Sequence, residues 1–295
     1  MAGKRLLGSV AAALALAVVA FVALGYRDAT AAPLVRRLSV TVPGYPADGR
    51  PVRIALFSDV HVHAPDMPPS RLAKIVGQIN RLHPDIIVAA GDFTGNNLIG
   101  RDYAPGQAIA PLRRLKARFG VYAVLGNNDY EAGSNAVSSA LESAGVRVLS
   151  NAATVVGPIA LGGIDGRIHH RFAGWREARE RTYKSLDSLP GVQVLVAHRP
   201  DEFVPAPRSV SLVLAGHTHC GQIVLPLVGA LESGSDYGTR FLCGVHRDGA
   251  KLLVVTAGLG TSHVPLRIGA PPDIWLVTVH GRLHNAGRPL LPPNS

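Results

Sequence analysis

Residues 210–222 read VSLVLAGHTHCGQ, in which a short uncharged run ends directly in a Gly-His-Thr-His segment. A short run rich in Val and Leu that a turn signal closes is typical of a β-strand buried on both faces. Gly216 permits a sharp turn and a close approach of the backbone. The stretch therefore predicts a buried strand with two histidines at its carboxyl end.

Four further segments repeat this pattern along the chain. Apolar runs at residues 52–57, 85–90, 121–125 and 192–197 end in Ser58-Asp59-Val60-His61, Gly91-Asp92, Gly126-Asn127-Asn128-Asp129 and His198. Segments with helical spacing lie between several of them, at residues 71–82, 107–118, 134–144 and 175–186. Strands that alternate with helices predict an α/β sheet, whose ligands bind beyond the carboxyl ends of the strands. Five polar strand ends at one edge therefore predict a functional site there.

Two pairs of candidate ligands are spaced two residues apart, Asp59 with His61 and His217 with His219. In an extended segment such residues point in the same direction. We therefore expect each pair to contact one ion.

Taken together, Asp59-x-His61, Gly91-Asp92, Gly126-Asn127-x-Asp129, His198 and Gly216-His217-Thr218-His219 resemble the calcineurin-like metallophosphoesterases. The resemblance runs from about residue 52 to 279. It implies a four-layer α-β-β-α sandwich with two mixed central sheets, preceded here by one N-terminal transmembrane helix. It also implies two divalent metal ions, with Mn, Fe or Zn suited to nitrogen and oxygen ligands. By the resemblance, Asp59, His61 and His219 bind one metal, Asn127, His198 and His217 bind the other, and Asp92 bridges them.

The activity implied is metal-dependent hydrolysis of a phosphodiester or pyrophosphate by a hydroxide that bridges the two metals. The blocks at 216–222 and 258–268 are similar to a bacterial membrane-anchored branch, which includes enzymes that cleave UDP-2,3-diacylglucosamine in lipid A biosynthesis. That substrate is one expectation. The alternative is a metal-binding, catalytically impaired homologue that acts as a binding protein, although all seven expected ligands are present.

One position departs from the family motif, in which a histidine stands between the Asn and the Asp. Here the residue is Asn128, beside Asp129, and we assign these two residues to the catalytic part of the site. An amide cannot act as a general acid at neutral pH but can donate a hydrogen bond. A phosphate leaving group needs no proton, because its second pKa is about 6. Asn128 therefore favours a substrate with a stable leaving anion. His63, His170 and His263 are candidate substitute acids, although each taken alone is more often structural.

Arg199 follows a predicted ligand and Arg267 lies in the late matched block. Guanidinium groups bind phosphate bidentately, so both are candidate substrate contacts, with a solvated surface arginine as the alternative. The two cysteines, Cys220 and Cys243, form no framework, and we expect two buried free thiols rather than one bridge. Cys220 is not expected to be a metal ligand.

The N-terminal segment carries Lys4 and Arg5 before an uncharged run of 20 residues, 6–25. As a helix this run would span about 30 Å, the thickness of a bilayer core. We expect residues 1–32 to be an uncleaved anchor in the cell inner membrane, with a cleaved signal peptide as the alternative. Residues 33–50 are expected to be a linker, 51–284 the catalytic domain and 285–295 a tail. The charges on both sides of the run leave the orientation open.

The formal net charge of +10 favours anionic partners, namely phosphorylated small molecules, lipid-linked substrates or the membrane surface. The charges are scattered, and no nucleic-acid-binding motif is visible. We therefore expect no nucleic-acid partner. The sequence leaves the oligomeric state open.

Overall fold

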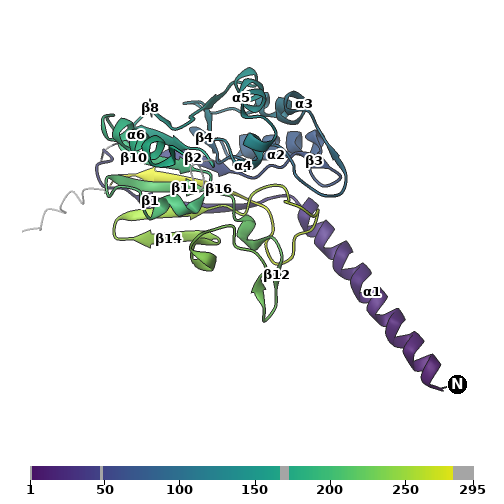
Figure 1. Cartoon of the computed structure of the whole chain (residues 1–295). Coiled ribbons are helices and arrows are strands. Elements are labelled where there is room, and N and C mark those ends of the chain that lie inside the picture. The colour runs from purple at the N-terminus through teal and green to yellow at the C-terminus, as the bar shows by residue number, and fades with distance from the viewer. Residues whose placement is uncertain (1, 47–48, 167–172, 282–295) are drawn as a thin grey trace, which may run out of the picture.

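The computed structural model describes residues 2–46, 49–166 and 173–281. Two six-stranded sheets lie face to face in it, and helices cover both outer faces (Figure 1). The predicted α-β-β-α sandwich is therefore confirmed. The end of the domain at residue 284, the tail at 285–295 and His170 lie outside the described residues.

The first sheet contains six strands in the order β1 (Leu34–Thr41), β16 (Asp273–His280), β2 (Val52–Phe57), β4 (Ile86–Ala89), β6 (Val121–Ala123) and β7 (Val146–Val148). The second sheet has the order β14 (Gly244–Asp248), β15 (Lys251–Val255), β11 (Val210–Ala215), β10 (Val192–Ala197), β9 (Ile159–Ile164) and β8 (Ala152–Val156). Both sheets are mixed, because β2–β16, β14–β15 and β8–β9 pair antiparallel within otherwise parallel sheets. The five strands expected from the sequence are β2, β4, β6, β10 and β11.

Two small two-stranded sheets complete the strands: β3 (His63–Ala64) pairs with β5 (Arg101–Asp102), and β12 (Val224–Leu225) pairs with β13 (Gly229–Ala230) as a hairpin. The helices are α1 (Ala2–Thr30), α2 (Pro69–Arg81), α3 (Pro105–Ile109), α4 (Asn127–Glu131), α5 (Ser134–Ser143) and α6 (Trp175–Asp187), and the 3-10 turns are η1 (Ala110–Arg114), η2 (Pro200–Phe203), η3 (His219–Gly221) and η4 (Gly238–Phe241). The helix expected at 107–118 is instead α3 followed by η1. Pro111 explains this difference, since its missing N–H cannot continue an α-helix.

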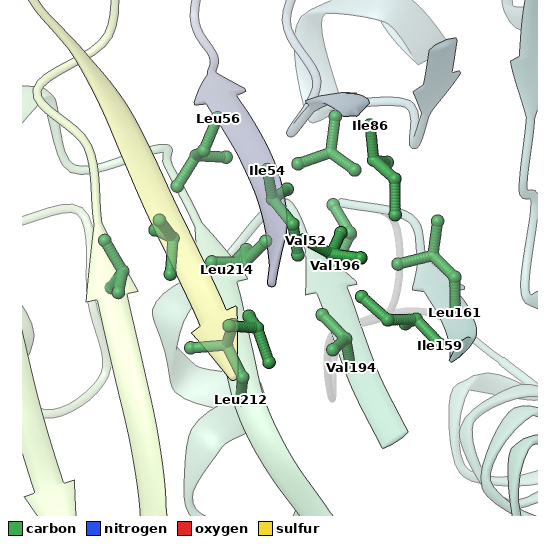
Figure 2. Packing of buried hydrophobic residues seen from close by; sticks show 14 of the residues in the cluster. Val52, Ile54, Leu56, Ile86, Ile159, Leu161, Val194, Val196, Leu212 and Leu214 are labelled. Atoms are coloured by element: carbon green, nitrogen blue, oxygen red, sulfur yellow. The ribbon is translucent and has the colours of Figure 1, made fainter. Parts of the chain in front are cut away.

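The main core lies between the sheets (Figure 2). Val52, Ile54 and Leu56 alternate along β2 and face residues such as Val194 of β10 and Leu212 of β11. Ala55 and Phe57 of β2 face the other way and pack with α2 and α5. Because successive side chains of a strand point to opposite faces, a strand between two apolar layers must be apolar throughout. This explains the continuous apolar runs of the sequence.

The linker expected for residues 33–50 is wrong over Leu34–Thr41. This segment is β1, which pairs in parallel with β16 from Leu34–Asp273 to Thr41–His280. Arg36 Nε donates to Asp273 Oδ2 at 2.7 Å and fastens the strand. The prolines and glycines of residues 33–50 lie before and after this edge strand and do not interrupt it.

The predicted apolar helix is present as α1, and Leu6–Thr30 is long and apolar enough to cross a membrane. Figure 1 shows α1 projecting from the body of the molecule. Its last turns are docked on the domain: the Arg267 amide donates to Gly25 O at 2.9 Å, and Arg71 Nη2 donates to Ala31 O at 2.9 Å. Ala29 is completely buried. The helix therefore leaves the domain from a fixed point.

Candidate metal centre

One group of predicted ligands joins the ends of β2 and β11. Asp59, His61 and His219 offer ligand atoms that lie within 4.8 Å of one another. His61 Nε2 is 3.1 Å from His219 Nε2, and Asp59 Oδ1 is 3.6 Å from His219 Nε2. All three side chains are buried. Their atoms surround one point, as the ligands of a single cation do.

A second group joins the ends of β4, β6, β10 and β11. Asp92, His198 and His217 also bring their ligand atoms within 4.8 Å of one another. His198 Nε2 lies 3.0 Å from His217 Nδ1 and 3.1 Å from Asn127 Oδ1. The amide oxygen of Asn127 therefore reaches the same point as the two imidazoles.

Asp92 lies between the two groups. Its Oδ2 atom is 3.4 Å from His198 Nε2 in the second group and 3.6 Å from His61 Nε2 in the first. Among the described residues, Asp92 is the one carboxylate that lies within 4 Å of a histidine in both groups. This is the position expected of a bridging ligand.

The expected pairing of residues two apart is correct for Asp59 and His61 but wrong for His217 and His219. These two histidines belong to different groups, His217 with Asp92 and His198, and His219 with Asp59 and His61. Five of the seven predicted ligands have a positive φ: Asp59, His61, Asp92, His217 and His219. Such backbone is unfavourable for residues other than glycine and clusters at functional sites.

Two glycines, Gly126 and Gly216, let the ligand-bearing loops lie close to one another. A methyl group on Gly126 would overlap the Asp92 carboxylate, and one on Gly216 would overlap the Ser58 hydroxyl and lie 2.5 Å from Asp59 Oδ2. The ligand-bearing loops approach one another more closely than any side chain at these positions would allow.

Backbone carbonyls orient two of the imidazoles. His61 Nδ1 lies 3.1 Å from Thr94 O, and His198 Nδ1 lies 2.7 Å from Ala90 O. A carbonyl only accepts, so each Nδ1 carries a proton and each Nε2 is the nitrogen that faces the centre. Histidines that bind metals are held in this way in proteins.

The charges of the site also suit cations. Asp59 Oδ1 is buried and has no hydrogen-bond partner among the described residues, although it faces His61 and His219. Burial, with cationic neighbours, lowers the pKa of His217 and of His219 well below the usual value, so both are neutral, which is the form of histidine that binds metals. Burial alone would lower the pKa of His198, but the Asp92 carboxylate raises it to about 9. Positive charge is therefore favoured beside Asp92, and the residues present fit two divalent cations.

Asn128 lines the cleft, but it also supports Asp92. Its Nδ2 atom donates to Asp92 Oδ2 at 2.7 Å and its backbone amide donates to Asp92 Oδ1 at 2.9 Å. One amide hydrogen is thus engaged with a ligand. Asn128 holds the bridging carboxylate in place as well as facing the cleft.

The catalytic assignment of Asp129 is not supported by its position. Its side chain is completely buried and accepts hydrogen bonds from the backbone amides of Asp92, Phe93, Thr94 and Gly126, at 2.8–3.2 Å. It fastens the turn after β4 to the turn after β6. This carboxylate is a framework group that positions Asp92.

Arg267 is neither the substrate contact nor the surface arginine expected from the sequence. It is fully buried and donates to Gly260 O, Ala257 O and Ala270 O at 2.6–3.0 Å. Its Nη2 atom lies 3.2 Å from His219 Nδ1, so the guanidinium packs behind the ligand, away from the cleft. Arg199 lies beside the other group, with Nη1 3.1 Å from His217 Nε2 and Nη2 3.4 Å from Asp236 Oδ1.

A cleft of about 390 Å³ opens over the centre and is lined by Asp92, Asn127, Asn128, His217 and His219. His263 also lines it, with Nδ1 2.7 Å from Ser262 Oγ. His63 does not line it, because it is buried at the start of β3, with Nε2 3.4 Å from Asp102 Oδ1. Of the described candidate acids, His263 is thus the one that faces the cleft.

The expectation of two free thiols is wrong, because Cys220 and Cys243 form a disulfide with a Cα–Cα distance of 4.8 Å. Thr218 Oγ1 donates to Leu242 O at 2.7 Å and holds the two segments together beside it. The bridge ties the turn that carries His217 and His219 to the start of β14. The separation of 23 residues gave no local signal of this pairing.

Gln222 is a site residue whose role the sequence did not reveal. Its side chain accepts from the Ser262 amide at 2.8 Å and donates to Ser262 O at 2.9 Å. It joins residues 216–222 to residues 258–268 at the wall of the cleft. The resemblance indicated both blocks but not their contact.

A family model described as calcineurin-like phosphoesterase matches residues 52–221. An uncharacterized metallophosphoesterase from Aquifex aeolicus is 33% identical over 241 residues, covering 79% of this chain and 87% of that protein. A transmembrane protein with metallophosphoesterase domain from Danio rerio is 32% identical over 277 residues, covering 88% of this chain but 61% of that protein. The crystal structure of the calcineurin-like phosphoesterase YfkN from Bacillus subtilis has a TM-score of 0.40 at 12% identity and covers 57% of this chain and 72% of that one. The matched residues 52–221 include all seven predicted ligands.

Proposed function

The chain belongs to the calcineurin-like phosphoesterase family, and from this premise we propose that it is a membrane-anchored phosphoesterase with two divalent cations. The observation that carries the proposal is the convergence of two ligand groups on either side of Asp92 at the floor of the cleft. Asp59, His61 and His219 would hold one cation, Asn127, His198 and His217 the other, and Asp92 would contact both. Mn, Fe or Zn suits this set of nitrogen and oxygen donors.

The two cations would supply Lewis acidity and a lowered pKa for a bound water. The protein groups orient the ligands and bind the phosphate. Thr94 O and Ala90 O orient the imidazoles, Asn128 and Asp129 hold Asp92, and the polar wall of the cleft receives the phosphate. Orientation by fixed groups is a large part of catalysis, because it removes the entropy cost of assembling the reactants.

The proposal is tested with bis-p-nitrophenyl phosphate, a diester with a good leaving group, after loading the purified protein with Mn²⁺. We expect metal-dependent release of p-nitrophenol that a chelator abolishes and that added Mn²⁺ restores. A protein that binds two metal ions per chain but releases no p-nitrophenol would favour the alternative of a binding protein.

Asn128→His is expected to raise the hydrolysis of an alkyl phosphodiester by about tenfold or more, because an imidazole can protonate an alkoxide leaving group. The rate on bis-p-nitrophenyl phosphate should change little, since its leaving group needs no proton and the backbone amide of residue 128 still donates to Asp92 Oδ1. The measurement is kcat/KM for both substrates. Unchanged alkyl-ester turnover would show that Asn128 was not limiting.

His263→Gln is the matched comparison for this experiment. A selective loss of alkyl-ester hydrolysis in that variant would assign the leaving-group proton to His263, the described histidine at the cleft wall outside the ligand groups.

We further propose that the domain lies on the oxidising side of the membrane. The Cys220–Cys243 disulfide supports this, because disulfides persist in oxidising compartments and are rare in the cytosol. Lys4 and Arg5 ahead of the apolar run agree with a cytoplasmic N-terminus. An outward domain would not meet UDP-2,3-diacylglucosamine, a cytoplasmic intermediate, so that substrate is not part of the proposal.

A topology reporter decides the orientation. Alkaline phosphatase fused after His280 in a bacterial host is expected to be active, whereas a green fluorescent protein at the same place should stay dark. A fluorescent fusion with inactive phosphatase would place the domain in the cytoplasm and would contradict the outward orientation.

A further inference from the structure

The most exposed large apolar side chains of the domain are gathered in two loops. Outside α1, the large apolar residues of the described chain with at least 60% exposure are Leu98 (78%), Ile99 (64%), Leu227 (108%), Val228 (68%) and Leu231 (60%). We call these five side chains the apolar rim. Scattered exposed residues need no explanation, but a concentration of this kind marks a contact surface.

Both loops are attached to one segment, residues 262–269, which also contacts α1. The Leu98 amide donates to His263 O at 2.9 Å, and the Val224 amide at the base of the β12–β13 hairpin donates to Ile268 O at 2.8 Å. Between these two points, Arg267 N donates to Gly25 O of α1. In Figure 1 the hairpin and α1 both extend downward from the body.

Gly25 fixes this junction closely. A methyl group there would lie 3.2 Å from Ile268 Cδ1 and 3.3 Å from Leu266 Cβ, so the helix rests directly on the segment. The apolar run 6–25 would span about 30 Å, the thickness of a bilayer core, which places Gly25 at the membrane surface. Residues 262–269, which contact Gly25, then lie at the membrane surface, and so do the two loops of the apolar rim that are bonded to them.

The hairpin has the composition of a membrane-contact loop. Residues 223–231 read IVLPLVGAL and contain no charge. Leu227 at its tip has a φ of 68°, a conformation unfavourable for a branched side chain, and in water this side chain gains no contact in return. A bilayer interface would bury it.

We propose that the apolar rim inserts into the bilayer interface beside α1, and that the cleft therefore acts on phosphoesters anchored in the bilayer. The inference rests on the proposed membrane anchor and names the substrate class of the proposed phosphoesterase. Ile223 and Leu231 of the hairpin arms and Val264 of the junction line the cleft next to the metal ligands. A lipid phosphodiester can thus keep its acyl chains in the membrane while its phosphate reaches the centre.

Insertion is tested with the full-length chain in vesicles of three parts phosphatidylethanolamine to one part phosphatidylglycerol, containing lipids brominated at carbons 6 and 7. The emission added by Leu227→Trp is expected to be quenched. The matched control is Val155→Trp on β8, a partly exposed position on the opposite edge strand, and its added emission should be unaffected. The unmodified protein gives the background of Trp175 and Trp275. If the protein floats with the vesicles but the Leu227→Trp emission is not quenched, insertion of the apolar rim is wrong. If the protein does not float with the vesicles, membrane anchoring by α1 is wrong as well.

The substrate class is tested with two p-nitrophenyl diesters, dioleoylphosphatidyl-p-nitrophenol in vesicles and bis-p-nitrophenyl phosphate in water. Leu227→Ser with Val228→Ser should lower kcat/KM about tenfold for the lipid diester only, because two buried apolar side chains are lost from the interface. Val155→Ser should leave both rates unchanged. An equal fall for both substrates, or an unmodified protein that hydrolyses only the soluble diester, would overturn the proposal. If neither diester is hydrolysed, the proposed phosphoesterase activity is wrong. The quenching experiment still tests insertion of the apolar rim in that case.

Discussion

Asp92→Asn is expected to lower phosphodiester turnover by about a thousandfold or more. Asparagine keeps the shape of the side chain but removes its negative charge from the point between His61 and His198. The two ligand groups would then lack the carboxylate they share. The measurements are kcat/KM on bis-p-nitrophenyl phosphate and the metal content of the purified protein.

Asp66→Asn is the matched control for this change. Asp66 is also buried, but its two oxygens accept from the neutral donors Asn97 Nδ2 and Thr261 Oγ1, at 3.1 and 2.8 Å. Loss of its charge should leave turnover within a few-fold of the unmodified protein. An Asp92→Asn protein that kept two metals and comparable turnover would show that Asp92 does not bridge the centre.

Asp129→Ala is expected to lower the free energy of unfolding by about 3–5 kcal/mol, because several buried backbone amides would lose their acceptor at once. Those amides belong to the turns after β4 and β6, which carry Asp92 and Asn127. The measurement is denaturant unfolding of the full chain in detergent micelles.

Asp129→Asn is the graded comparison, since its single amide oxygen can accept part of these hydrogen bonds, and its loss of stability should be smaller. If Asp129→Ala unfolded like the unmodified protein but were inactive, the catalytic role suggested by the sequence motif would be correct and the framework role wrong.

The parts of the fold that local sequence patterns determine could be predicted from the sequence. The apolar runs that end in Asp59, Asp92, Asn127, His198 and His217 were visible because a strand between two apolar layers must be apolar throughout. A polar ligand at its end then stands out. The helices at 71–82, 134–144 and 175–186 were predicted from the helical spacing of their apolar residues, which is also a local pattern.

The remainder depends on contacts between distant residues. The roles of Asp129 and Arg267 arise from backbone groups that the folded loops bring to them, and the residues themselves carry no sign of it. His217 contacts His198 and His219 contacts His61, which come from distant parts of the chain, and the spacing of two residues carries no sign of this. β1 escaped notice because it is an edge strand without a strongly apolar pattern.

The central claim is that two cations bind on either side of Asp92, and anomalous diffraction from crystals of the Mn²⁺- or Zn²⁺-loaded protein tests it directly. We predict two anomalous peaks, one among Asp59, His61 and His219 and one among Asn127, His198 and His217, with the Asp92 carboxylate in contact with both. A single peak, or metal bound elsewhere while these side chains stay unliganded, would contradict the account.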